Sequence, residues 1–185
     1  MSFRAWLRHM YNHLIGRLFG YNPSQHVYDA PAGIKIIRTT IHHAKAIHNL
    51  EKECFSDPWS IRSIKYEITH PQSICFVAVN DSRVTYKKIL GHITMRHILD
   101  EGHINNIAVA EQARRQGIGR GLIEALIYEA NALGITSLTL EVRSKNHAAI
   151  SLYEKLGFVT CGHRKNYYRN PIDDALVMVN EVNAN

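Results

Sequence analysis

The chain has 185 residues, which is enough for one domain with a hydrophobic core and short for two. Its formal net charge of +6 at pH 7 indicates an acidic partner, such as nucleic acid, a ribonucleoprotein, an anionic cofactor or a membrane surface, and does not choose among them. Three scattered cysteines argue against a disulfide framework or a zinc site and predict a reducing cytoplasm, and no apolar run reaches the roughly 18 residues of a membrane-spanning helix.

Residues 1–23 differ from the rest of the chain because they contain no acidic side chain and repeat apolar residues at helical spacing, with basic residues largely between them. This pattern predicts a basic amphipathic helix. We expect the helix to pack on the domain or on a second subunit rather than to lie on a membrane surface through residues 1–20; an organellar transit peptide is a third interpretation. Pro and Gly residues then indicate a linker that ends near Gly33. The predicted organisation is an extension and linker over residues 1–33 and one domain over residues 34–185.

The remaining sequence alternates between strand and helix patterns. The spacing of apolar residues predicts helices at 42–55, 60–70, 117–134 and 146–157. Ser60 is expected to cap the second helix and Gly134 to end the third. Strands are predicted at 34–40, 73–80, 88–99, 102–110, 137–142, 158–165 and 175–182. The strand–helix–strand–helix–strand order of the second half requires a partly parallel sheet, and the antiparallel meander before it makes the sheet mixed. The predicted fold class is therefore α+β with one mixed sheet.

Residues 114–121, RRQGIGRG, concentrate three glycines and three arginines between a predicted strand and a predicted helix. Clustered glycines indicate a sharp turn or a close approach of backbone to a ligand, and the planar fork of arginine suits phosphate. Neither the Walker A pattern nor G-x-G-x-x-G matches, because the glycines fall at alternate positions. The remaining pattern, R-x-x-G-x-G at the start of a helix, favours a backbone cradle for a diphosphate, with a tight turn carrying solvated arginines as the alternative.

Residues 105–168 resemble the Gcn5-related N-acetyltransferase (GNAT) superfamily, and within it the ribosomal-protein-alanine N-acetyltransferases of the RimI type. The likeness rests on NIAV before the loop, R/Q-x-x-G-x-G, LEVRxxNxxAIxLYExLGF, RxNYY followed by DAxxM, and an upstream CFSDPWS. Together these motifs extend the resemblance over roughly residues 34–182. It implies a GNAT-like single mixed, mostly antiparallel sheet, with helices on both faces and a splayed central strand pair.

The resemblance also implies the reaction. It predicts an enzyme that moves an acetyl group from acetyl-CoA, without a metal, to the N-terminal amine of a protein, expected to be a ribosomal protein with N-terminal alanine. Two alternatives keep the fold: a GNAT that acetylates a small-molecule amine, and a non-catalytic acyl-CoA-binding module. No direct nucleic-acid binding is expected, and both a monomer and a homodimer fit the sequence.

The resemblance further assigns roles to individual residues. Glu141 is the expected general base and Tyr153 the expected general acid. Residues expected to contact acetyl-CoA through a strand, the glycine loop and a later helix are Ile107, Ala108, Val109, Arg114, Arg115, Gln116, Gly117, Ile118, Gly119, Arg120 and Asn146. A base is needed because an α-amino group has a reference pKa of about 8 and only the free amine attacks a thioester.

Several residues near these positions have open roles. His103 is a second candidate proton acceptor on the strand that leads to the glycine loop. Tyr167 and Tyr168 either line the peptide groove or are ordinary strand residues. Asn105 departs from the family, which has a larger apolar residue at this position, and the departure bears on the width of the acceptor slot.

Overall fold

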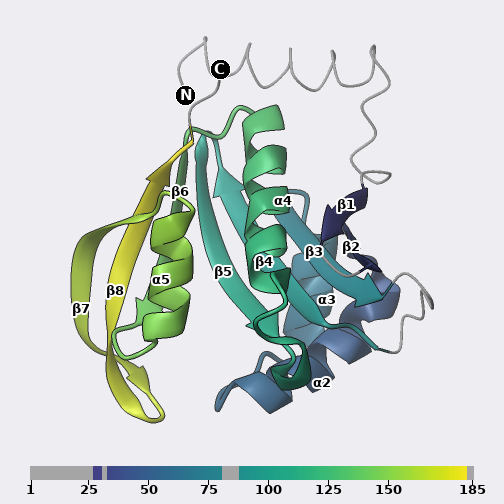
Figure 1. Cartoon of the computed structure of the whole chain (residues 1–185), viewed down its shortest axis with the longest axis horizontal. Helices are drawn as coiled ribbons and strands as arrows, with labels where there is room; N and C mark the ends of the chain where they lie inside the picture. Colours follow the sequence, from purple (N-terminus) through teal and green to yellow (C-terminus); the bar gives the residue numbers. More distant parts are fainter. Residues whose placement is uncertain (1–26, 31–32, 81–87, 183–185) are drawn as a thin grey trace.

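The protein is described by a computed structural model that covers residues 27–30, 33–80 and 88–182. These residues form one sheet in the order β1-β2-β3-β4-β5-β6-β8-β7, together with four α-helices (Figure 1). The strands are β1 Val27–Ala30, β2 Ile34–Arg38, β3 Ser73–Asn80, β4 Gly91–Ile98, β5 Glu101–Val109, β6 Ser137–Arg143, β7 Val159–Arg169 and β8 Ile172–Glu181. The helices are α2 Ala44–Cys54, α3 Ile61–Thr69, α4 Ile118–Ala132 and α5 His147–Lys155.

The sheet is mixed but mostly antiparallel, as the sequence predicts. Within the described residues, β5 and β6 form a parallel pair and every other neighbouring pair is antiparallel. Helices cover both faces, with α4 and α5 on one side and α2 and α3 on the other (Figure 1). Adjacent residues of β4 illustrate this: a Cβ on Gly91 would meet α4, whereas the His92 ring lies 3.3 Å from Glu51 of α2.

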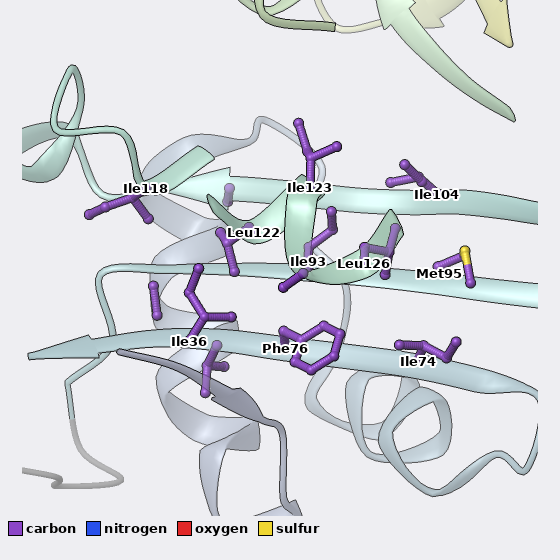
Figure 2. Packing of buried hydrophobic residues seen from close by; sticks show 14 of the residues in the cluster. Ile36, Ile74, Phe76, Ile93, Met95, Ile104, Ile118, Leu122, Ile123 and Leu126 are labelled. Carbon is purple, nitrogen blue, oxygen red and sulfur yellow. The ribbon is translucent and has the colours of Figure 1, made fainter. Parts of the chain in front are cut away.

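The core fills the space between α4 and the middle of the sheet. Leu122, Ile123 and Leu126 of α4 lie over Phe76 of β3 and Ile93 of β4 (Figure 2), and all five side chains are fully buried. Burying a side chain of this size stabilises the fold by roughly 1.5–3 kcal/mol. The apolar spacing along α4 therefore fixes which face of the helix meets the sheet, and with it the position of the loop at its N-terminus.

The central strands β5 and β6 part after a short paired stretch, which confirms the expected splayed pair. Their pairing runs from Glu101↔Ser137 to Ile104↔Leu140, although both strands continue beyond it. On its other side β5 carries a bulge, because Ile104 pairs with Met95 and Asn106 pairs with Thr94, which leaves Asn105 unopposed. An extra residue of this kind bends a strand and increases its twist. The bulge therefore lies where β5 turns away from β6.

Two of the differences from the sequence-based expectation concern the edge strands of the sheet. Val27–Ala30, predicted as part of the linker, is strand β1 and pairs with β2. Strand β7 continues to Arg169 instead of ending at residue 165, and it forms a hairpin with β8 in which Tyr168 pairs with Asp173. The amphipathic helix predicted within residues 1–23 lies outside the described residues, so the division at residues 33 and 34 stays a prediction.

Candidate active site

Glu141 is the first residue of β6 beyond the last β5–β6 pair. Leu140 and Val142 are buried on the α4 and α5 side of the sheet, so the side chain between them points to the opposite face. The Glu141 carboxylate is only 10% exposed and has a basic partner on each oxygen. Oε2 lies 3.0 Å from His103 Nε2 on β5, and Oε1 lies 3.3 Å from Arg164 Nη2 on β7. One carboxylate thus bridges the two sides of the opening between β5 and β6.

The two candidate proton acceptors are therefore direct neighbours. The Nδ1 atom of His103 is 2.9 Å from Thr139 Oγ1, which is also 3.3 Å from the carbonyl oxygen of Gly102. If the Thr139 hydroxyl donates to Nδ1, a neutral His103 donates its Nε2–H to Glu141. If the hydroxyl donates to the Gly102 carbonyl, Nδ1 carries a hydrogen and donates it to the Thr139 oxygen. A second proton is then needed for a hydrogen bond between Nε2 and Glu141. The pair therefore has two arrangements that differ by one proton.

Tyr153 lies on α5, on the other side of β6 from the Glu141 carboxylate. Its ring is 5% exposed and is tilted against Phe158, with 5.8 Å between ring centroids. Burial, followed by the nearby Tyr168, raises the pKa of the Tyr153 hydroxyl well above its ordinary value. Burial also raises the pKa of Tyr168 to about 12, with Tyr167 and Glu141 among the further causes. The structure brings Glu141 and His103 into contact, but it gives Tyr153 no direct contact with either.

The glycine loop turns through two left-handed residues. Arg115 has φ 64°, and Gly117, the N-cap residue immediately before α4, has φ 81°. The left-handed region of backbone conformation is unfavourable for residues that carry a side chain, and it turns successive backbone N–H groups toward one side. No side chain caps α4, so the amides of its first turn remain available to a ligand near the positive end of the helix dipole. The backbone geometry fits a diphosphate.

The side chains of the loop are less free than the sequence suggests. Arg114 donates from Nε to the Val109 carbonyl at 3.3 Å, and Arg120 forms an exposed ion pair with Glu124 at 2.8 Å. Part of the hydrogen-bonding capacity of these two guanidinium groups is therefore used by contacts within the protein. Arg115 is exposed and Ile118 is fully buried, so Ile118 can offer a ligand only its amide.

Two further predicted contact residues also have structural roles. A Cβ on Gly119 would lie 3.2 Å from Leu152 Cδ2, so this glycine permits the close approach of α4 to α5. Asn146 caps α5 by accepting a hydrogen bond from the amide of Ala149 at 3.2 Å. Ile107, Ala108 and Val109 lie on β5 beyond its pairing with β6, so no strand in the described part of the chain pairs with this edge.

A second boundary of the opening is formed by the α2–α3 loop, residues 55–60, and the β7–β8 hairpin. Ser56 Oγ donates to the carbonyl of Asn170 in the hairpin. The Arg143 guanidinium donates to the Asn170 and Pro171 carbonyls at 2.8 and 2.9 Å and lies 4.2 Å from the centroid of the Tyr168 ring. Sequence reasoning did not single out Arg143, although it lies two residues from Glu141 on the same face of β6.

Two buried carboxylates face the same side of the sheet from α2 and α3. Glu51 is fully buried, and burial raises its pKa to about 7. Glu67 is 5% exposed and accepts hydrogen bonds from Ser73 and Arg96, each at 2.6 Å, and from Asn105 at 3.2 Å. Glu67 also lines a cavity of about 390 Å³ with Trp59, Arg62, Ser63 and Tyr66. Neither glutamate was predicted, because only the fold brings them beside β5.

The described residues contain neither a membrane-spanning helix nor a metal-binding cluster. No helix among them is long and apolar enough to cross a membrane. Among residues 27–30, 33–80 and 88–182, no three His, Cys, Asp or Glu side chains are grouped in a way that could hold a metal ion. The candidate active site is the β5–β6 opening, because His103, Glu141 and Arg164 meet there.

Comparison with known proteins identifies the family of the chain. The acetyltransferase (GNAT) family model matches residues 44–158, and the chain belongs to this family. The ribosomal protein bS18-alanine N-acetyltransferase of Escherichia coli K12 is 36% identical over 135 residues, which cover 72% of this chain and 87% of that protein. The resemblance found in the motifs is thereby confirmed, and the protein is an N-acetyltransferase.

Two solved structures share the fold. The crystal structure of the ribosomal-protein-S18-alanine N-acetyltransferase from Escherichia coli has a TM-score of 0.73 and 32% identity, covering 80% of this chain and 94% of that one. The crystal structure of the NatC complex bound to Gag peptide and CoA has a TM-score of 0.72 and 25% identity, covering 81% and 99%.

Proposed function

We propose that this protein transfers the acetyl group of acetyl-CoA to the N-terminal amine of a protein that begins with alanine, a ribosomal protein being the natural acceptor. The observation that carries the proposal is the Glu141 carboxylate, held where β5 and β6 part and bonded to His103. The Escherichia coli relative is named for alanine acetylation on ribosomal protein bS18. Acetyl-CoA, when bound, supplies an acetyl group activated as a thioester.

Glu141 is the proposed general base. An α-amino group, with a pKa of about 8, is mostly protonated at neutral pH and must lose a proton before it attacks. His103 and Arg164 hold the two oxygens of the Glu141 carboxylate in place. Because the His103 side chain is 43% exposed, it offers the proton a way from the carboxylate to solvent.

Tyr153 is the proposed general acid. Burial raises its pKa, so the phenol keeps its proton throughout the neutral range and can donate it to a leaving thiolate. Tyr153 and Glu141 lie on opposite sides of β6. A thioester bound in the opening between β5 and β6 would lie between these two residues, with its acyl group facing Glu141 and its sulfur facing Tyr153.

Backbone groups would hold most of acetyl-CoA. The free edge of Ile107, Ala108 and Val109 suits an extended amide-containing arm, because strand edges bind such arms through main-chain hydrogen bonds. The amides from Gln116 to Arg120 suit the diphosphate. Arg115 is the most available side chain for the same charge.

The experiment compares Glu141→Gln with the wild-type enzyme on an N-terminal alanine peptide. The substitution keeps the shape but removes the basicity, so we expect kcat to fall by roughly 10²–10⁴ while desulfo-CoA still raises the melting temperature. Higher pH should restore part of the rate, because more of the amine arrives deprotonated. Full activity of Glu141→Gln at every pH, with His103→Ala inactive, would transfer the base role to His103.

A further inference from the structure

The bulge in β5 places two consecutive asparagines on the same face of the sheet. Side chains of successive strand residues normally point to opposite faces. Asn105 and Asn106 both point toward α2 and α3 instead, because the extra residue at Asn105 interrupts the alternation. Each asparagine donates to a buried carboxylate from a different helix, Asn105 to Glu67 at 3.2 Å and Asn106 to Glu51 at 2.8 Å.

Glu51 also holds the loop that borders the opening. Its Oε2 accepts the backbone amide of Trp59 at 2.7 Å, while its Oε1 accepts the hydrogen bond from Asn106. The Trp59 carbonyl is in turn 2.8 Å from His48 Nδ1, so two side chains on one face of α2 hold both polar backbone groups of this residue. The same loop reaches the β7–β8 hairpin through Ser56 and Asn170.

Among the described residues, no Lys or Arg side chain forms an ion pair with Glu51. The imidazole Nε2 of His92 lies 3.3 Å from Glu51 Oε1 without making a hydrogen bond, and burial lowers the pKa of His92 to about 4. A carboxylate is an expensive group to bury, and two neutral donors compensate it only in part. A carboxylate has, however, two oxygens that accept from two different directions, here from β5 and from the α2–α3 loop.

We propose that Glu51 is a positioning residue that couples the two substrate sites, by tying the cofactor strand β5 to the acceptor-side α2–α3 loop through its two oxygens. This inference rests on the proposed function, which assigns β5 to acetyl-CoA; the α2–α3 loop, joined to the β7–β8 hairpin through Ser56, borders the same opening, and we assign it to the acceptor. Glu67 holds the bulge residue Asn105 in a similar way, but its other hydrogen bonds come from Ser73 and Arg96 and not from the backbone of the loop.

The test measures KM for acetyl-CoA, KM for the peptide, kcat, and the melting shift produced by desulfo-CoA. Glu51→Ala removes both ties, so we expect kcat/KM to fall roughly 10–100-fold, with both KM values raised and the melting shift reduced. Glu51→Gln should stay within about threefold of wild type, because its amide oxygen can accept from Trp59 while its NH2 donates to a reoriented Asn106. Glu53→Ala removes an exposed carboxylate from the same helix and is the matched control.

Asn106→Ala cuts only the tie to β5, so we expect it to raise KM for acetyl-CoA and leave KM for the peptide nearly unchanged. This variant decides the question alone if Glu51→Ala does not fold. A folded Glu51→Ala with wild-type KM values and a wild-type melting shift overturns the inference, as does Asn106→Ala with acetyl-CoA binding intact. If the wild-type enzyme acetylates no N-terminal peptide, the proposed function fails, while the desulfo-CoA shifts of these variants still test the tie to β5.

Discussion

The Glu51→Gln substitution should change the way in which stability depends on pH. Burial raises the pKa of Glu51 from 4.5 to about 7 in the folded protein. Below the unfolded pKa the side chain is neutral in both states, and between the two values only the unfolded chain ionises. The free energy of unfolding therefore falls as pH rises through this window, and the stability that the neutral form provides is lost above about 7.

The size of this effect follows from the shift. A difference of one pKa unit corresponds to about 1.4 kcal/mol, so the full shift amounts to about 3 kcal/mol. Glutamine is neutral at every pH and can keep both hydrogen bonds. The advantage in unfolding free energy of Glu51→Gln over wild type should thus grow by about 3 kcal/mol between pH 4 and pH 8.

Urea unfolding at several pH values measures this difference directly. Glu53→Gln, at an exposed position of the same helix, corrects for the loss of a charge from α2. A difference between Glu51→Gln and wild type that grows no more with pH than the Glu53→Gln difference would refute the account of Glu51 as a buried carboxylate held by neutral donors.

Three further predictions follow from the site and its frame. Tyr153→Phe should slow acetyl transfer without weakening desulfo-CoA binding, and the defect should shrink with a donor whose leaving group is more acidic; an equal loss with every donor would contradict the acid role. Gly117→Ala, at φ 81°, costs about 1–2 kcal/mol and should reduce the desulfo-CoA melting shift more than Gly119→Ala, whose new methyl group meets Leu152 instead; the reverse order would contradict the loop geometry. Deleting residues 1–26 should leave turnover within about threefold. Deleting residues 1–33 also removes β1 and should lower the unfolding free energy by roughly 2 kcal/mol or more, because Tyr28 packs on Phe76 and donates a hydrogen bond to Glu129; equal stability of the two deletion variants would show that β1 does not stabilise the fold.

Local patterns predicted most of the elements correctly. Period and caps located α2 to α5, and Ser60 does cap α3 through the amide of Ser63. They failed at the edges of the sheet. The β7 strand is mostly exposed and has no alternation of buried and exposed residues, so its length could not be read from hydrophobic spacing. The β1 strand is four residues long and lies among turn-forming residues.

The site was harder to predict because it depends on register. His103 and Glu141 appeared as competing bases, yet the parallel pairing of His103 with Thr139 puts them 3.0 Å apart. Asn105 appeared as a departure from the family pattern, and its partner Glu67 lies 38 positions earlier in the chain. Such contacts are set by tertiary structure and leave no periodic signal in the sequence.

The central claim is that the acceptor is the α-amine of a protein N-terminus. The most direct measurement incubates the enzyme and acetyl-CoA with a peptide that begins with alanine, the same peptide with a blocked N-terminus, and a polyamine, and reads each product by intact mass. The account predicts the gain of one acetyl group on the free alanine peptide alone, abolished by Glu141→Gln at neutral pH. Acetylation of the polyamine or of the blocked peptide, with the free alanine peptide unmodified, would contradict it.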